Sequence, residues 1–169
     1  TDKFLWLQGR QVWMFAKLYN QVEQREDWLE CAIHGADFLK RFGHDGDYNW
    51  YFSLNRAGKA LVQPYNIFSY TFAAMAFAQL SLATGRDEYA DIARRTLDRI
   101  LEKEKNPKGQ WNKAVPGTRE LKNFALPMIM SNLALEMADC NPRFRKKLDQ
   151  PFNKIKKDQA EHLTNARKP

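Results

Sequence analysis

An internal repeat constrains the fold of this chain more than any other feature. Residues 25–28 (REDW) recur as residues 86–89 (RDEY), a shift of 61 residues. A fainter third copy follows after a further 55 residues and carries Met75 onto Met130. Each copy holds an apolar segment of helical periodicity, a short polar turn and a second, amphipathic segment. Helix hairpins repeated at this period cannot bury their apolar faces singly, so the copies must stack on one another.

The periodicity and the turn residues together place the expected elements. Gly85 suits a helix end in the left-handed conformation, and Pro127 suits a first helical turn. Aromatic and branched residues on both sides of a Gly-containing turn predict a short β-hairpin within residues 49–63. The hairpin segments are expected over residues 11–22 and 28–42, 67–83 and 88–105, and 127–137 followed by a basic segment after residue 142.

The two segments of each copy differ in how their apolar residues are distributed. Residues 67–77 are apolar nearly all round, whereas residues 88–105 carry one apolar stripe opposite charged side chains. This difference predicts an inner ring of buried helices wrapped by an outer ring. We therefore predict an all-α fold in which three helix hairpins form part of an α/α toroid. The inner helices are expected to lie side by side and to start near Leu5, Ile67 and Pro127.

The positive charge of the chain is concentrated at one end. The net charge is +7, and residues 143–169 contribute +6 through nine Lys/Arg against three carboxylates. The sequence therefore predicts a partial barrel over residues 1–142 and a basic segment, helical or frayed, over residues 143–169. A basic tail on a nearly neutral body disfavours nucleic acid as a partner, because phosphate binding usually needs a cationic face on the folded unit.

Several classes of protein are excluded by what the sequence lacks. No apolar run approaches the roughly 20 residues that span a bilayer, and the first residues do not form a signal peptide. We therefore expect a cytoplasmic protein without a membrane partner. Cys31 and Cys140 lie far apart, and the three histidines cluster with neither of them, which predicts reduced thiols and no metal site.

The first segment carries one pattern that suggests chemistry. Helical spacing places Trp6, Arg10, Trp13 and Lys17 along one face. Tryptophan rings stack on the C–H faces of sugars, and arginine offers fixed donors to hydroxyl or developing oxyanion oxygens. A structural arginine, paired with a carboxylate of a neighbouring helix, explains the same spacing equally well. The spacing alone leaves both interpretations open.

The same segment carries a family resemblance. Residues 3–14 (KFLWLQGRQVWM) closely resemble the signature of the N-acylglucosamine 2-epimerases, a family that includes the renin-binding proteins of animals. Residues 67–69 (IFS), 83–85 (ATG), 126–128 (LPM) and 131–133 (SNL) also look like this family. The resemblance runs from Lys3 to about Met137.

The resemblance implies the N-terminal half of an (α/α)6 barrel around a sugar pocket. It implies removal and return of the proton at C2 of an open-chain N-acyl-hexosamine, or of a related aldose. An arginine matching Arg10 would be catalytic and stabilise the enolate-like intermediate, while Trp6, Trp13, Phe68 and Lys122 would bind substrate. Lys113 is a weaker candidate than Lys122. No redox cofactor is required, and some relatives bind ATP as an effector. Independently of the resemblance, exposed inner helices of a half-barrel would favour pairing with another subunit, which makes a homodimer a candidate assembly.

The resemblance also implies what the chain lacks. Family members are roughly twice as long, and their two acid–base histidines lie in the second half. None of His34, His44 and His162 is expected to project from an inner helix, so we expect this segment alone to be inactive.

Two alternatives remain. A glycoside hydrolase on an α/α barrel would need two opposed carboxylates in the cavity, whereas the inner segments carry only Glu23 and Glu136, near helix ends. A non-catalytic half-barrel could instead be an interaction module.

Overall fold

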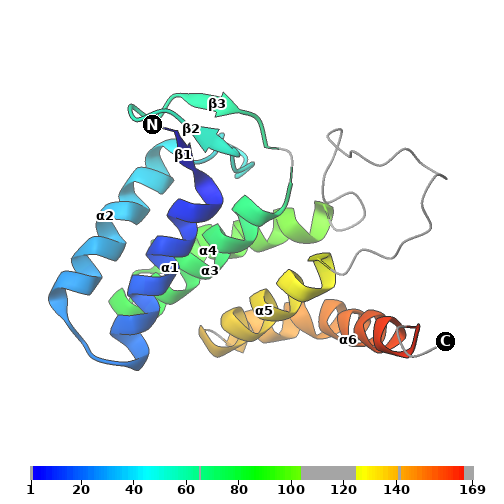
Figure 1. Ribbon diagram of the computed structural model, residues 1–169. Coiled ribbons are helices and arrows are strands. Elements are labelled where there is room, and N and C mark those ends of the chain that lie inside the picture. Colours follow the sequence, from blue (N-terminus) through cyan, green and yellow to red (C-terminus); the bar gives the residue numbers. More distant parts are fainter. Residues whose placement is uncertain (1, 65, 104–124, 141, 166–169) are drawn as a thin grey trace. The chain divides into compact units, whose positions relative to one another are not determined.

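The computed structural model describes residues 2–64, 66–103, 125–140 and 142–165 (Figure 1). They contain six helices and three short strands. The helices are α1 (Leu5–Gln21), α2 (Glu26–Phe42), α3 (Phe68–Thr84), α4 (Asp87–Lys103), α5 (Ala125–Cys140) and α6 (Pro142–Asn165). The strands are β1 (Lys3–Phe4), β2 (Ser53–Leu54) and β3 (Ala60–Val62). The chain divides into two compact units, residues 1–111 and 112–169, and each is described by itself.

Turn chemistry sets the ends of the helices in the first unit. Acidic residues occupy the first turn of both α2 and α4, where they interact favourably with the positive end of the helix dipole. Asp27 accepts a hydrogen bond from the amide of Trp28 at 3.1 Å. Helix α3 ends at Gly85, which has a φ of 66°. The amide of Gly85 donates a hydrogen bond to the carbonyl of Ser81. The hairpin boundaries expected from the recurring acidic turns and from Gly85 are therefore confirmed to within a few residues.

Helices α1 and α3 run in the same direction and pack closely together. A Cβ added at Gly9 would lie only 3.1 Å from the backbone carbon of Phe72, so glycine is what allows this close approach. Further along both helices, Asn20 donates to the carbonyl and side-chain oxygens of Gln79, each at 2.9 Å. Because the contacts advance together along both helices, α1 and α3 are parallel neighbours, as the stacking of the repeat predicts.

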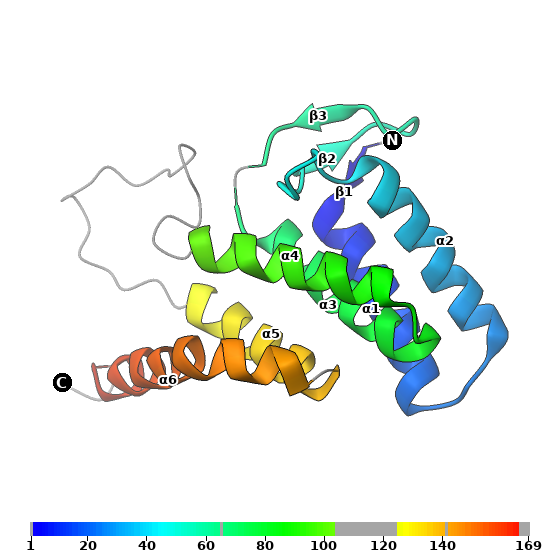
Figure 2. The ribbon, with the colours of Figure 1, turned by 180° about the vertical axis from the view of Figure 1, so that it is seen from behind.

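Helix α3 is the most deeply buried element of the first unit. Eleven of its 17 residues are buried, which fits a helix that is apolar nearly all round. Helix α4 buries one stripe that includes Ile92, Leu97 and Ile100 and exposes its charged face. Figure 2 shows α4 lying along α3. The predicted distinction between a buried helix and an amphipathic covering helix is confirmed for this hairpin.

A small antiparallel sheet closes one end of the first unit (Figure 1). The predicted β-hairpin is present, since β2 pairs with β3. Strand β1 pairs with β2, joining Lys3 to Leu54 and Phe4 to Ser53. The sheet order is thus β1-β2-β3, and β1 fixes the point at which α1 begins.

The second unit is a hairpin of α5 and α6. Phe144, Leu148 and Ile155 of α6 are buried, and Gln159 donates to the hydroxyl of Ser131 on α5 at 2.7 Å. The basic segment, expected to be helical or frayed, is helical through Asn165. In the part of the chain that the structure describes, no helix is long and apolar enough to cross a membrane.

Candidate functional site

One face of α1 is buried and the opposite side is open. The buried stripe consists of Leu5, Gly9, Val12 and Ala16, which follow one another at helical spacing. Leu7 and Met14, on the open side, remain 42% and 43% exposed. The face predicted to carry chemistry lies between these two stripes.

That face presents a cation beside aromatic rings. Arg10 is exposed, and Trp6 and Trp13 are half-buried. The ammonium of Lys17 lies 5.3 Å from the centroid of the Trp13 ring, within the range of a cation–π contact. Within the described residues, no carboxylate forms an ion pair with Arg10, so the structural interpretation of this arginine finds no support there. A ligand-binding role for Arg10 stays a prediction.

Phe68 begins α3 at the end where α1 also begins. Its amide donates to the side-chain oxygen of Asn66 at 3.0 Å, which satisfies one of the first amides of the helix. Helices α1 and α3 are parallel, and Gly9 lies next to Phe72. One helical turn before these residues, Trp6 of α1 and Phe68 of α3 therefore lie at the same height along the helix axes. The structure therefore brings the start of α3 near the aromatic end of the α1 face. The role of these residues in substrate binding stays a prediction.

The two candidate lysines and the three histidines considered in the sequence analysis are not residues of α1. Lys122, and the weaker candidate Lys113, lie outside the described residues. His34 is exposed on α2, and His44 lies in the loop after α2 with its ring stacked 4.5 Å from Tyr48. The side chain of His162 also lies outside the described part. Neither histidine that the structure describes projects from α1, α3 or α5.

The loop that holds His44 is closed by its own hydrogen bonds. Asp45 accepts from the amide of Asp47 at 2.9 Å and from the amide and side-chain nitrogen of Asn49 at 2.9 and 3.0 Å. Burial works against ionisation, yet these hydrogen bonds hold the pKa of Asp45 below its ordinary value. Among the described residues, no cluster of histidine, cysteine and carboxylate side chains is suited to a metal ion. Asp45 therefore has a structural task in this loop.

Sequence reasoning missed one residue at the start of α3. Ser69 is 2% exposed, and its hydroxyl is buried without a hydrogen-bond partner. It belongs to the IFS segment that carries the family resemblance, which was the one available signal. A hydroxyl left unsatisfied by the fold cannot be recognised before the packing is known.

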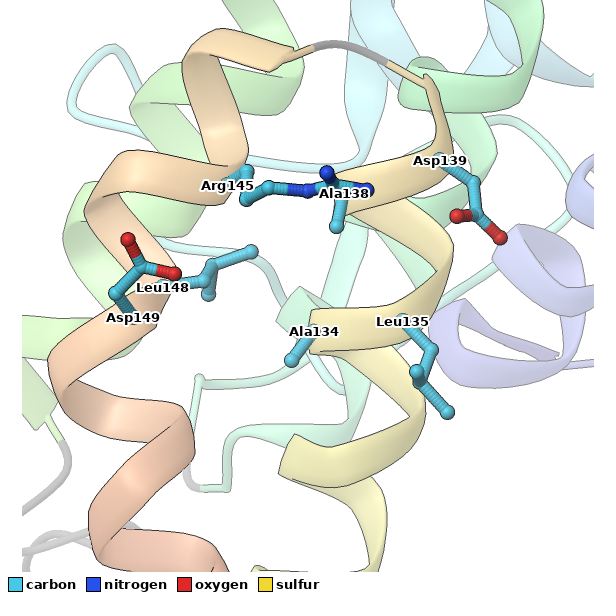
Figure 3. Close-up of a pocket in the computed structure, with 7 residues that line it drawn as sticks. All are labelled: Ala134, Leu135, Ala138, Asp139, Arg145, Leu148 and Asp149. Atoms are coloured by element: carbon cyan, nitrogen blue, oxygen red, sulfur yellow. The ribbon is translucent and has the colours of Figure 1, made fainter.

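Two cavities in the described part of the chain are lined by residues other than those of the α1 face. A cavity of about 240 Å³ lies between α5 and α6, where Arg145 extends from α6 toward Ala138 of α5 (Figure 3). A second, of about 210 Å³, lies between the loop at Gly46 and the outer side of α4. Neither contains Trp6, Arg10, Trp13 or Phe68. We therefore base the candidate site on the chemistry of the α1 face, where Arg10 has no ion-pair partner among the described residues, and not on cavity size.

The fold corresponds to part of the (α/α)6 barrel of the sugar epimerases. The chain is similar to the cellobiose 2-epimerase of Spirochaeta thermophila, with a TM-score of 0.68 and 20% identity over 86% of this chain and 41% of that one. It is similar also to the cellobiose 2-epimerase of Bacillus thermoamylovorans, with a TM-score of 0.69 and 15% identity over 88% of this chain and 42% of that one. At these identities the likeness establishes the fold.

Sequence comparison then gives the family. Residues 1–166 match the N-acylglucosamine 2-epimerase (GlcNAc 2-epimerase) family, and the chain belongs to it. The bovine N-acylglucosamine 2-epimerase is 33% identical over 144 residues, which are 82% of this chain and 34% of that protein. The human N-acylglucosamine 2-epimerase is 31% identical over the same length and the same shares. The chain thus spans about a third of the length of these curated relatives.

Proposed function

We propose that this chain forms part of a sugar 2-epimerase or isomerase, which removes and returns the proton at C2 of an N-acyl-hexosamine or related aldose. The observation that carries the proposal is the exposed Arg10, which has no carboxylate partner among the described residues and lies beside Trp6 and Trp13 within the family's signature segment.

The chemistry of the reaction explains why a cation is needed. A proton next to a carbonyl can be removed at a useful rate only if the charge that develops on the carbonyl oxygen is stabilised. A guanidinium is always charged and presents several fixed N–H donors. Arg10 would bind that oxygen, and the faces of Trp6 and Trp13 would contact the C–H surface of the sugar. Phe68 and Lys122 complete the proposed binding set.

The names of the relatives favour one substrate class. The curated relatives at 31–33% identity are N-acylglucosamine 2-epimerases, whereas the cellobiose 2-epimerases share 15–20% identity with this chain. An N-acyl-hexosamine is therefore the preferred substrate of the proposal. No redox cofactor enters the reaction, ATP would act only as an effector, and a homodimer is the proposed assembly. A cytoplasmic location is part of the proposal, because two cysteines this far apart in the sequence are typical of reduced thiols.

Binding of sugar to this chain tests the proposal directly. N-acetylmannosamine is titrated into the chain, and the amide and tryptophan indole signals are followed by NMR. We expect weak, saturable binding with shifts centred on α1, because Trp6 and Trp13 lie at the proposed contact. Arg10→Ala should weaken binding about tenfold, the scale of losing a charge-assisted hydrogen bond.

Arg94→Ala is the matched control, since Arg94 is an exposed helix arginine that is paired with Asp91 on the outer side of α4. Its affinity for the sugar should equal that of the unmodified chain. Equal losses in the Arg10 and Arg94 variants, or no binding by the unmodified chain, would overturn the proposal.

A further inference from the structure

The hydroxyl of Ser69 is an exception in a well-satisfied interior. Among the described residues, it is the one buried side-chain polar atom without a hydrogen-bond partner. An unsatisfied buried hydroxyl is unfavourable, and alanine at this position would avoid that cost. Other hydroxyls of α3 illustrate the usual solution, since Ser81 donates to the carbonyl of Ala78 at 2.7 Å and Thr71 to that of Phe68 at 3.0 Å.

Ser69 also lies in the first turn of α3, where helix amides can donate hydrogen bonds to acceptors outside the helix. It is the second residue of α3, and the first amides of a helix have no acceptor within the helix. Phe68 and Thr71 donate to Asn66 and Ile67, but no described residue accepts from the amide of Ser69. The helix dipole adds a partial positive charge at the same place. Among the described residues, neither the hydroxyl nor the amide of Ser69 therefore has a hydrogen-bond partner.

Helix geometry directs this hydroxyl toward the candidate site. Side chains of a helix point back toward its N-terminus, so Ser69 is directed to the end at which α3 begins. Parallel packing puts that end beside the start of α1, because Gly9 meets Phe72 and Ala73 one turn further on. Ser69 is thus level with Trp6, at the end of α1 that carries Arg10.

We propose that Ser69 is a further sugar-binding residue, whose hydroxyl and amide hydrogen-bond an oxygen of the substrate at the start of α3. This inference rests on the proposed function, because it assumes that a sugar lies against α1. A sugar hydroxyl both donates and accepts, so it can satisfy the serine hydroxyl and the amide together.

The test separates binding from structure. In Ser69→Ala, the affinity for N-acetylmannosamine should fall about five- to tenfold in the NMR titration. The melting temperature of the same variant should be unchanged or higher, because the substitution removes a buried polar atom that has no partner. Ser81→Ala, on the same helix and with its hydroxyl already satisfied, should bind the sugar like the unmodified chain.

The outcomes distinguish this inference from the proposed function. If Arg10→Ala weakens binding and Ser69→Ala does not, the assignment of Ser69 is wrong and the proposed function stands. If the unmodified chain does not bind the sugar, the proposed function fails and this inference fails with it. Equal losses of affinity in Ser69→Ala and Ser81→Ala would show a general effect on α3 and would also overturn the assignment.

Discussion

At the residue scale, Trp50 shows how a single polar contact orders the interior of the first unit. Its ring is fully buried, and its indole nitrogen donates to the hydroxyl of Thr96 at 3.1 Å. The ring also lies 5.9 Å from that of Phe77, measured between centroids. The loop after α2 is thereby attached to both α3 and α4. A buried indole needs such a partner, since its N–H would otherwise be unsatisfied.

A double-mutant cycle on Trp50 and Thr96 tests this contact. Trp50→Phe should lower the free energy of unfolding by about 2–4 kcal/mol, because it leaves a cavity and an unsatisfied hydroxyl. Thr96→Val should cost about 1–3 kcal/mol by leaving the indole N–H without an acceptor. The double variant should lose about 1 kcal/mol less than the two single losses together. Urea unfolding provides the measurement, and strict additivity would show that the hydrogen bond contributes nothing.

The lowered pKa of Asp45 predicts how the stability of the chain changes at acidic pH. Hydrogen bonds from Asn49 and Asp47 hold its pKa below the ordinary 3.8 even though burial opposes this. A lowered pKa in the folded state means that the contribution to stability is complete above about pH 4 and is lost as the pH falls through the folded pKa. The stability difference between the unmodified chain and Asp45→Asn should therefore be constant from pH 5 to 7. It should shrink below pH 4 in urea unfolding series, and a difference that does not change with pH would contradict this account.

At the scale of elements, Gly85 ends α3 by its backbone conformation alone. Its φ is 66°, and an added Cβ would meet nothing within 4 Å. Gly85→Ala should therefore cost about 1 kcal/mol, the strain of a left-handed L-residue. Gly46 offers the matched control, because a Cβ there also meets nothing but its φ is not positive. Thermal unfolding should show Gly46→Ala close to the unmodified chain, and equal effects at both positions would exclude strain as the cause.

Elements with local signals could be predicted from the sequence, and those without could not. The apolar character of residues 67–77 predicted the burial of α3, and Gly85 predicted its end. Strand β1 had no such signal, because Lys3 and Phe4 become a strand only by pairing with β2 some 50 residues later. The α1 face followed from helical spacing, but the orphaned hydroxyl of Ser69 did not. Whether a polar atom finds a partner depends on tertiary packing, which no local pattern encodes.

At the scale of the whole molecule, the positions of the two described histidines bear on whether the chain can exchange the C2 proton of a sugar. Proton removal and return at C2 needs two groups within hydrogen-bond reach of that carbon. His34 is exposed on α2, and His44 is stacked on Tyr48 in a loop. Neither shares a helix with Arg10. We therefore expect this chain by itself to bind sugar without exchanging the C2 proton.

Isotope exchange checks this expectation. The chain is incubated with N-acetylmannosamine in deuterated water, with and without ATP, beside the bovine N-acylglucosamine 2-epimerase as a positive control. Deuterium should appear at C2 only with the bovine enzyme. Exchange by the chain that disappears on changing one of His34, His44 or His162 to alanine would overturn the expectation and make that histidine catalytic.

The parallel packing of α1 against α3 has a consequence for how the protein is made. Asn20 and Gln79 are 59 residues apart, and a ribosome adds about 5–20 residues per second. Helix α1 therefore leaves the ribosome roughly 3–12 s before the helix that covers it. During that interval its apolar stripe is exposed to the cell, and only the hairpin with α2 can form. The rate at which the segment between α2 and α3, with strands β2 and β3, is translated sets how long the nascent chain is open to chaperones and to aggregation.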